Sequence, residues 1–506
     1  MKGGKGLARL QGAVSRHGLP ALAGLVWRTV RKLCLKGALG LARQDRPFLS
    51  VDLDPAPPAR VRASWPPMLD ANRTLPAKAW TRWLDRLLAS AQTSPAAAAG
   101  DALLPMLKAG DQPRPELAHV LAKIPPDVQV VTFDLWRTAG ETVEPLPLPG
   151  ADPLLLAERD YLFSRAALRP GLLRADGDVR RSILDWGAGR SLSEVRAGWR
   201  HIGLPLVEAA ISDEEQAAPP TPSGKVSASR IEPVSVVLCT RDKGHLTRQL
   251  VRALLADDGV GEIVIVSNGT ANPHALRTLA DLAADPRVTV LKRDEPFNFA
   301  RLCNAGFQET KLSGPLLFIN DDVTPVAEDW LSALATRLDD PDTGADGALL
   351  LYPDERVQHA GMYLRQQGGA GHLLRFARLP QDDYLGLAAS AREVTAVTGA
   401  VLLTRRADFE AVGGFDEALA ISLQDVDYCL KLRRLGRRNV FEPRAVLLHM
   451  ESTSLQGVLA TPAVVRQRHA DHQLFMSRWG DQVAADPFHP AGFDPEDETL
   501  HRLVKP

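Results

Sequence analysis

From residue 234 to residue 319, short apolar runs rich in β-branched residues alternate with longer segments of helical periodicity. Strands that alternate with helices pair in parallel through right-handed crossovers. A strand covered on both faces is apolar along its whole length, as these runs are. The pattern therefore predicts a parallel α/β sheet. The expected strands are 234–239, 262–266, 287–291 and 315–319, and the expected helices are 244–256, 273–284 and 298–309.

The fourth expected strand ends in Asn320, Asp321 and Asp322, which places two carboxylates side by side. Adjacent carboxylates repel each other unless positive charge is near. Asn and Asp are common in solvated turns, and this dipeptide alone favours such a turn. Ligands of α/β sheets, however, bind beyond the carboxyl ends of the strands. Hard oxygen ligands at that place also suit Mg²⁺ or Mn²⁺ bridged to a polyphosphate.

Polar and basic residues follow the other expected strands at the same edge of the sheet. Thr240 and Arg241 follow the first strand, and Asn268 lies in the turn after the second. Arg301 and Asn304 lie in the helix that begins after the third. One rim of the sheet is therefore expected to gather cations, amide donors and the carboxylate pair.

Residues 231–455 resemble the catalytic domain of a family 2 glycosyltransferase with the GT-A fold, which is a Rossmann-like mixed sheet flanked by helices. The resemblance is closest to the bacterial enzymes that build cell-surface polysaccharides. Each matching segment is weak alone, but the combination is specific because the segments stand in the family's order. They read SVVLCTRD, VSNGT, PFNFARLCNAG, FINDDV, VTGAVLLTRRADFEAVGGFDE and LQDVDYCLKLRRLGRRNVFEPRAVLLH.

The resemblance implies a metal-dependent, inverting hexosyltransferase that uses a nucleotide-diphosphate sugar. Its acceptor would be a growing glycan or a lipid-linked saccharide of O-antigen, capsule or exopolysaccharide. Asp425 matches the catalytic base. Asp322 takes the metal-binding place of the family's DXD motif, and His449 matches a histidine that completes the metal site in some relatives. The implied cofactor is a divalent cation, Mg²⁺ or Mn²⁺.

The resemblance also assigns residues to the two substrates. On the acceptor side it places Gly399 and Asp427, and the Gly-rich segment 366–371 is either a lid over the site or a plain disordered loop. The family usually carries an acid where this chain has Ser267 and Asn268, and that acid commonly contacts the base of the donor nucleotide. The resemblance therefore does not decide between a uridine and a thymidine donor. The donor-binding residues that it implies are Thr240, Arg241, Asn268, Arg301, Asn304 and Asp321.

Several of these residues also have a purely structural interpretation. Asp425 and Asp427 would lie in the first turn of a helix, where the helix dipole favours acids without any catalytic duty. A histidine that follows a strand, such as His449, is usually only packed or hydrogen-bonded. Two other classes of protein also stay open: a sugar nucleotidyltransferase, and a catalytically silent glycan-binding or assembly subunit. The first would carry a Gly-rich basic loop where this chain has CTRDKGHL.

Length and composition predict how the rest of the chain divides into domains. At 506 residues, the chain is long enough for two or three domains. The accessory domain is expected to be α/β or mostly helical, with helical patterns over 77–92 and 100–109. It is also a candidate for a partial, degenerate GT-A-like domain, in which only Asp134 remains of an acid pair. The expected parts are a basic amphipathic segment (1–50), an accessory domain (51–211), a linker (212–230), the transferase domain (231–455) and a C-terminal helical extension with its tail (456–506).

Charge and cysteine content bear on partners and location. The formal net charge of −1 gives no basic footprint for nucleic acid. The four cysteines stand far apart, which fits a reducing cytoplasm better than a disulfide framework. The basic N-terminal segment either contacts the inner membrane from the cytoplasmic face or packs elsewhere. Its longest uncharged stretch, 17–27, is too short to span a bilayer.

Overall fold

The computed structural model describes residues 102–139, 142–216, 232–450, 461–483 and 486–503. The chain divides into two compact units, Met1–Pro57 and Pro58–Pro506, and all described residues belong to the second. The expected basic segment at the N-terminus and the expected helix at 77–92 lie outside the described residues, as does most of the expected linker.

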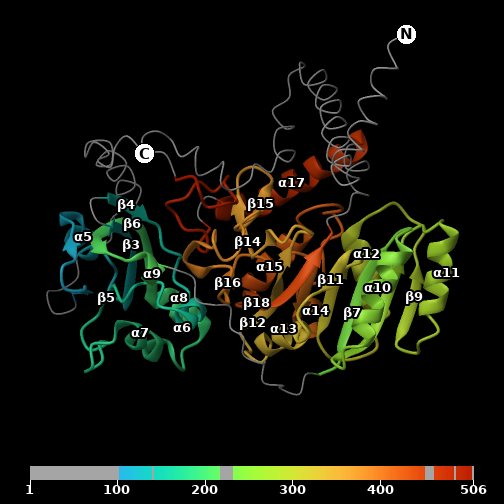
Figure 1. Cartoon of the computed structure of the whole chain (residues 1–506), viewed down its shortest axis with the longest axis horizontal. Helices are drawn as coiled ribbons and strands as arrows, with labels where there is room; N and C mark the ends of the chain where they lie inside the picture. Colours follow the sequence, from blue (N-terminus) through green and yellow to red (C-terminus); the bar gives the residue numbers. More distant parts are fainter. Residues whose placement is uncertain (1–101, 140–141, 217–231, 451–460, 484–485, 504–506) are drawn as a thin grey trace, which may run out of the picture. The chain divides into compact units, whose positions relative to one another are not determined.

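A ten-stranded mixed sheet organises residues 234–449 (Figure 1). Its main path, in order across the sheet, is β11 (Val323–Pro325), β18 (Arg438–His449), β12 (Thr343–Leu351), β17 (Val401–Thr404), β10 (Leu316–Asn320), β7 (Val234–Thr240), β8 (Val260–Ser267) and β9 (Val288–Lys292). Two short strands lie off this path: β13 (Val357–His359) pairs with β12, and β16 (Arg392–Val394) pairs with β18.

The parallel part of the sheet confirms the predicted pattern. β7 pairs in parallel with β8 and with β10, and β8 pairs in parallel with β9. In this register Thr240 lies beside Ser267, and Cys239 lies beside Asn320. The polar residues that follow β7, β8 and β10 therefore leave the sheet at one edge.

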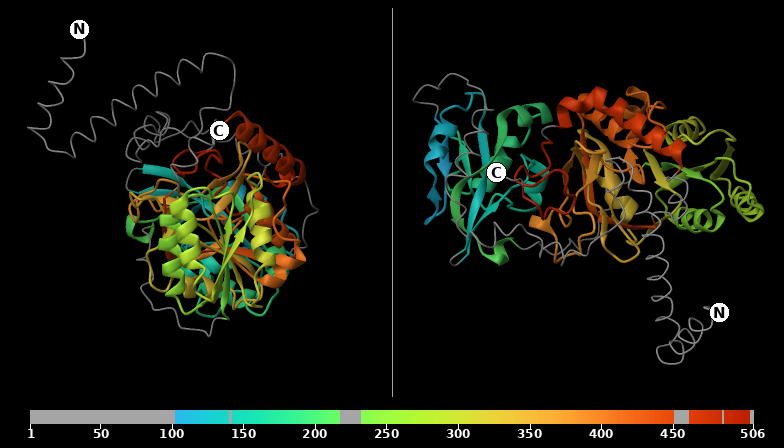
Figure 2. Two further views of the ribbon diagram at one scale, coloured as in Figure 1. Left: turned by 90° about the vertical axis from the view of Figure 1, so that its right-hand side faces the viewer. Right: turned by 90° about the horizontal axis from the view of Figure 1, so that it is seen from above.

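Helices cover both faces of the parallel strands, as the left view of Figure 2 shows. Alternate residues of β7 face opposite sides: Val236 and Leu238 pack with α10 and α11, whereas Val237 packs with α12. This alternation creates two apolar cores, one on each face of the sheet. The helices are α10 (Gly244–Leu255), α11 (Pro273–Leu282), α12 (Phe299–Gln308), α13 (Trp330–Arg337), α14 (Arg406–Ala411) and α15 (Gln424–Arg434).

The segment between β13 and β16 contains a hairpin and a short 3-10 helix, η1 (Tyr384–Gly386). The hairpin pairs β14 (Met362–Arg365) with β15 (Gly369–His372), and it packs against the long C-terminal helix α17 (Pro462–Val483). Segment 366–371 is therefore the turn and second strand of a packed hairpin, and its interpretation as a plain disordered loop was wrong. Helix α17 lies within the expected C-terminal extension, 456–506.

A second, six-stranded sheet lies in residues 104–210, with the order β1 (Leu104–Met106), β5 (Ala166–Leu168), β3 (Val130–Ala139), β6 (Trp199–Ala210) and β2 (Gln112–Pro113). The strand β4 (Thr142–Leu146) pairs with β3. The accessory region is thus α/β and not mostly helical. Its helices are α5 (Pro115–Leu121), α6 (Pro153–Glu158), α7 (Val179–Gly187), α8 (Leu192–Gly198) and α9 (Asp213–Gln216).

The helix predicted at 100–109 was wrong, because β1 occupies this stretch. Pro105 lies in the middle of the strand, and proline in a helix interior removes a backbone donor and clashes with the preceding turn. The flanking Leu104 and Met106 pair with β5 instead. Among the described helices, none is both long and apolar enough to cross a membrane.

Candidate active site

The carboxylate pair after β10 is held by Thr240, the last residue of β7, and by Lys243 in the loop that follows it. Thr240 Oγ1 donates a hydrogen bond of 2.7 Å to Asp321 Oδ2. Lys243 Nζ lies 3.3 Å from Asp321 Oδ1 and 3.2 Å from Asp322 Oδ2. Both carboxylates are buried, with 6% and 5% of their surface exposed. The ammonium of Lys243 therefore supplies the positive charge that lets the two acids stand side by side.

The two aspartates differ in their electrostatics. Burial raises the pKa of Asp321 above its ordinary value, although the charge of Lys243 and the hydroxyl of Thr240 oppose the shift. Burial also pushes the pKa of Asp322 upward, but the hydrogen bond and charge of His449 and the charge of Lys243 outweigh it. Its pKa is lowered to about 2. Asp322 is therefore ionised at any physiological pH.

His449 ends β18 and faces Asp322 with one ring nitrogen. Its Nε2 lies 3.1 Å from Asp322 Oδ1, and its Nδ1 lies 2.6 Å from Gln358 Oε1. The amide oxygen of Gln358 accepts, so Nδ1 carries a hydrogen. Asp322 and Gln358 therefore fix the orientation of the His449 ring from its two sides.

The donor set of Asp322 and His449 fits a divalent cation that is shared with a phosphate ligand. Carboxylate oxygen and imidazole nitrogen are both ligands of Mn²⁺, and Mg²⁺ is commonly held by one or two carboxylates together with substrate phosphates and water. Within the described ranges, no group of three or more His, Cys, Asp or Glu side chains converges as a complete metal site. Diphosphate oxygens and water would therefore supply the remaining ligands.

Asp425 lies in the first turn of α15, and its carboxylate is oriented by backbone donors. The N–H group of Gly399 donates to Asp425 Oδ2 at 2.8 Å, and that of Val426 donates to Oδ1 at 2.9 Å. Burial raises the pKa of Asp425 above its usual value, partly offset by these hydrogen bonds. The residue is partly exposed, which is the access that an incoming hydroxyl would need. A general base needs this combination of reach and a raised pKa.

A short series of contacts joins Asp425 to the end of β10. Gly399, which binds the Asp425 carboxylate, is followed by Ala400, whose carbonyl accepts from the N–H group of Asn320 at 3.0 Å. The amide of Asn320 lies 3.5 Å from His449 Nε2. The structure therefore brings the predicted base and the predicted metal ligands to the same edge of the sheet. This grouping supports their predicted roles, which stay predictions.

The other two predicted donor residues near this edge differ in exposure. Asn268 is buried, and its Nδ2 donates to the carbonyl oxygens of Arg293 at 2.9 Å and Glu295 at 2.8 Å. Its Oδ1 is buried without a hydrogen-bond partner in the structure. Arg241 is exposed. Asn268 thus organises the backbone after β9, and Arg241 is free to approach a ligand.

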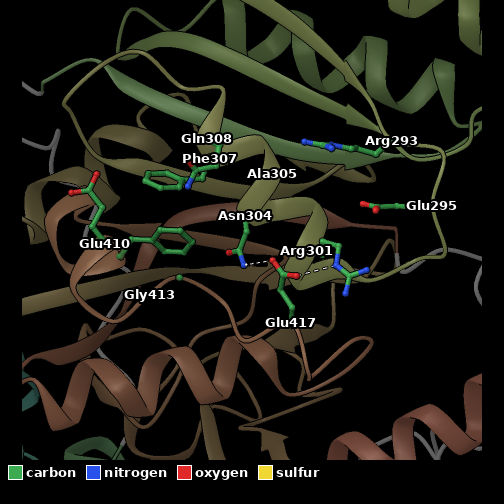
Figure 3. Close-up of a pocket in the computed structure, with 12 residues that line it drawn as sticks. Arg293, Glu295, Arg301, Asn304, Ala305, Phe307, Gln308, Glu410, Gly413 and Glu417 are labelled. Atoms are coloured by element: carbon green, nitrogen blue, oxygen red, sulfur yellow. Dashed lines mark hydrogen bonds and ion pairs between the residues drawn. The ribbon is translucent and has the colours of Figure 1, made fainter.

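Arg301 and Asn304 lie in a pocket of about 500 Å³ between α12 and the loop after α14 (Figure 3). Both contact Glu417, which accepts from Arg301 Nε at 2.9 Å and from Asn304 Nδ2 at 3.2 Å. Asn304 also donates to the carbonyl of Phe415 at 2.8 Å. Neither Thr240 nor the acid pair is among the residues that line this pocket. The donor-binding roles of Arg301 and Asn304 stay predictions.

Of the two residues predicted on the acceptor side, only Gly399 lies beside the candidate base. Asp427 is fully buried. Its Oδ1 accepts from Trp479 Nε1 at 2.9 Å, and its Oδ2 forms an ion pair of 2.8 Å with Lys431. An enclosed carboxylate that is already engaged has no group to offer an acceptor. The surroundings of Asp427 therefore do not support the acceptor-side prediction and indicate an anchor for α17 instead.

Sequence reasoning missed Lys243, Glu417 and the role of Asp242. Asp242 has a positive φ of 58°, and its Oδ1 accepts from the N–H groups of Ala271 and Asn272 at 2.8 and 2.7 Å. It thereby ties the loop after β7 to the start of α11. The signal for Lys243 was present, because a basic residue in the loop after the first strand lies at the edge where the acid pair was expected.

Comparison with known proteins agrees with this geometry. A family model described as glycosyl transferase family 2 matches residues 235–412, a range that ends before Asp425 and His449. Uncharacterized protein y4gI of Sinorhizobium fredii is 35% identical over 50% of this chain and 28% of its own length. O-antigen biosynthesis protein RfbC of Myxococcus xanthus is 36% identical over 49% of this chain and 20% of its own length. The chain thus spans less than a third of either relative.

Among solved structures, GalNAc-T7 in complex with UDP, GalNAc and Mn²⁺ aligns with 52% of this chain and 59% of its own. The sequence identity is 16% and the TM-score is 0.38, a likeness too low to bear on substrate or metal. The family assignment depends instead on the sequence match and on the order of the motifs along the sheet edge. On these grounds, residues 235–412 match glycosyl transferase family 2.

Proposed function

We propose that this chain is an inverting glycosyltransferase, which moves a sugar from a nucleotide-diphosphate donor to a glycan or lipid-linked saccharide. The observation that carries the proposal is the link from Asp425 through Gly399 and Ala400 to the end of β10. It brings a partly exposed carboxylate with a raised pKa to the edge that holds the acid pair. One group can accept a proton there while others hold a diphosphate.

The reaction needs one displacement at the anomeric carbon of the donor sugar. The acceptor oxygen forms its bond to that carbon while the bond from the carbon to the diphosphate oxygen breaks, with inversion. The acceptor proton passes to the carboxylate of Asp425, and the electron pair of the broken bond leaves on the diphosphate. No covalent intermediate is required, so much of the acceleration comes from alignment of the two substrates.

Charge on the leaving diphosphate is the second demand of this reaction. Asp322 and His449 would hold a divalent cation, which when bound acts as a Lewis acid on the diphosphate oxygens. Lys243 adds a fixed positive charge to the same place, and the exposed guanidinium of Arg241 is available to the phosphates. The donor diphosphate would therefore meet cationic groups at the edge that holds the acid pair.

The biological setting that we propose is the synthesis of a bacterial surface polysaccharide on the cytoplasmic face of the membrane. Support comes from the motif pattern and from RfbC, a relative whose name places it in O-antigen biosynthesis. The acceptor would then be a growing glycan or a lipid-linked saccharide.

The test is a panel of nucleotide sugars, assayed for nucleoside diphosphate release with Mn²⁺ or Mg²⁺ in the presence of saccharide acceptors. Asp425→Asn should retain donor binding by calorimetry and lose turnover by about 100-fold or more, because a positioned base contributes 10²–10⁴. Asp258→Asn, an exposed acid in the loop after α10, is the matched control. Full turnover by the Asp425 variant would refute the assignment. Glycan binding without any release would indicate a silent binding subunit.

A further inference from the structure

Helix α17 reaches the backbone on both sides of the candidate base, although it follows that base by some 40 residues of sequence and lies beyond the family match. The loop before α15 leads through Leu423, which has a positive φ of 68°, into Gln424 and Asp425. A leucine in the left-handed region is strained and needs surroundings that fix it.

Asp471 of α17 fixes the backbone that precedes the base. It is fully buried, and it accepts hydrogen bonds from three consecutive N–H groups. These belong to Ala420, Ile421 and Ser422, at 3.2, 2.9 and 3.0 Å. The amide of Gln467 adds a fourth donor at 2.8 Å. The Ser422 hydroxyl is a fifth donor at 3.5 Å, and a carboxylate that gathers this many donors is a directional clamp on the loop.

The same loop is held from its other side by α12. The N–H group of Phe299 donates to the carbonyl of Ala420 at 2.9 Å, so this peptide is gripped at both ends. Leu423 is enclosed as well, since a Cβ atom built on Gly369 would meet Leu423 Cδ1 at 3.0 Å and Phe475 of α17 at 3.2 Å. Little room is left for the loop to shift.

A second contact from α17 fixes the turn that follows the base. Trp479 Nε1 donates to Asp427 Oδ1 at 2.9 Å, and Arg478 Nη1 lies 3.2 Å from the same oxygen. Arg478 also forms an ion pair of 2.5 Å with Asp416, at the start of the loop. These contacts hold Asp427, two residues after the base, from one turn of α17.

We infer that α17 positions the candidate base Asp425, through Asp471 on the backbone before it and Trp479 on Asp427 after it. Asp471 and Trp479 are positioning residues, because neither touches the reacting atoms. The inference rests on the proposed function, since it assigns these residues to the same reaction. A misplacement of about 1 Å at a reacting group can cost about 100-fold in rate.

Asp471→Asn and Trp479→Phe test the inference, with Asp481→Asn, an exposed acid of the same helix, as the matched control. Asp471→Asn should lower kcat by about 10-fold to 100-fold and leave the KM for the donor within about twofold. The acid limb of its pH profile should move to lower pH, because a looser loop exposes Asp425 to water and returns its pKa towards the ordinary value. Trp479→Phe keeps an aromatic ring but removes the indole N–H that binds Asp427, and it should show a smaller loss in the same direction. The control should behave as wild type.

Hydrogen exchange of the full chain supplies a readout that does not depend on turnover. In Asp471→Asn, the amides of residues 420–422 should exchange faster than in wild type. Suppose that Asp425→Asn is inactive, and that Asp471→Asn exchanges faster but keeps the kcat and the acid limb of wild type. This result would leave the proposed function intact and overturn the positioning role. If Asp471→Asn fails to fold, wild-type kinetics in Trp479→Phe would overturn it. A wild-type chain that turns over no nucleotide sugar would overturn this inference together with the proposed function.

Discussion

At the scale of single residues, Lys243 explains how the chain tolerates two buried, adjacent carboxylates. Its ammonium contacts both Asp321 and Asp322, and only 21% of its side chain is exposed. Without this charge, the two acids would face each other in a poorly solvated place. Removing one partner from a buried charged group costs more than the group's net contribution, because the remaining charge stays desolvated.

Lys243→Met should therefore lower the free energy of unfolding by about 1–3 kcal/mol in the presence of EDTA. Added Mn²⁺ with a nucleoside diphosphate should stabilise the variant more than wild type, since a cation would replace the lost charge. Urea unfolding with and without these ligands measures both effects. Lys292→Met, at the exposed end of β9, is the control. A variant as stable as wild type in EDTA would show that the pair does not depend on Lys243.

The sequence predicted the place of the acid pair, but it did not predict the contacts of Lys243 or the burial of Asp427. The acid pair was visible because both residues follow one apolar run. The position of Lys243 after the first strand was visible too, but its contacts with the acid pair were not. Its partners lie 78 and 79 residues further along the chain. The burial of Asp427 was hidden in the same way, because Trp479 comes from a helix 52 residues later. Local patterns show which residue types reach an edge, but the contacts between distant segments decide which of them stay free.

At the scale of elements, the parallel strands were predictable because each is a short, continuous apolar run, and a segment of helical periodicity separates one run from the next. The accessory region was harder, since β1, β2 and β5 have three residues or fewer and proline lies in β1 and β2. Pro105 excluded the helix predicted at 100–109, but only the pairing of β1 with β5 turns that stretch into a strand. Strand pairing across 60 residues leaves no local mark on the sequence.

Two helical glycines give a matched prediction about helix packing. A Cβ atom on Gly306 of α12 would meet Val237 Cγ1 at 2.5 Å and Val266 Cγ2 at 2.9 Å, whereas the nearest atom for Gly480 of α17 is Met476 Cε at 3.8 Å. Gly306→Ala should destabilise the fold by about 1–3 kcal/mol through overpacking. Gly480→Ala should stabilise it by about 0.5–1 kcal/mol through helix propensity. Chemical denaturation measures both, and equal effects would contradict the close approach of α12 to β7.

His489, in the segment after α17, gives a prediction about pH. Burial lowers its pKa from 6.5 to about 4, although nearby aspartates oppose the shift, and its ring packs on Tyr363 with centroids 4.4 Å apart. The unfolded chain therefore binds a proton that the folded chain refuses between these two pH values. Stability contributed by neutral His489 is present above pH 6.5 and is lost as pH falls towards 4.

His489→Phe should remove this part of the pH dependence. Between pH 7 and pH 5, wild type should lose about 2 kcal/mol more of its free energy of unfolding than the variant. Urea titrations at the two pH values measure the difference. An equal loss in both proteins would show that His489 is protonated in the folded state.

At the scale of the whole molecule, the described chain carries two large sheets besides the β14–β15 hairpin, and the proposed chemistry lies on the larger of the two. Asp134 of β3 is the acid that remains in the smaller sheet. It is 1% exposed, and its Oδ1 accepts from the N–H group of Leu148 at 2.7 Å and lies 3.2 Å from His201 Nε2. Its contacts are those of a structural acid.

Asp134→Ala should therefore leave turnover per folded molecule within about twofold and lower the free energy of unfolding by about 1–3 kcal/mol. Steady-state kinetics, corrected for the folded fraction by circular dichroism, separates the two effects. Asp127→Asn, an exposed acid before the same strand, is the control. A well-folded but inactive Asp134 variant would mean that the smaller sheet takes part in the reaction.

The antiparallel strand β17 lies between β10 and β12 and reverses the direction of the chain inside the large sheet. Its entry turn at Thr398 and Gly399 therefore meets the exit of β10 at Asn320, although some 80 residues separate them. The segment between Asn320 and Thr398 therefore leaves and returns at the same edge of the sheet. Changes of length in the loops of this segment leave its two ends in place, because the pairing of β17 with β10 fixes where the chain returns.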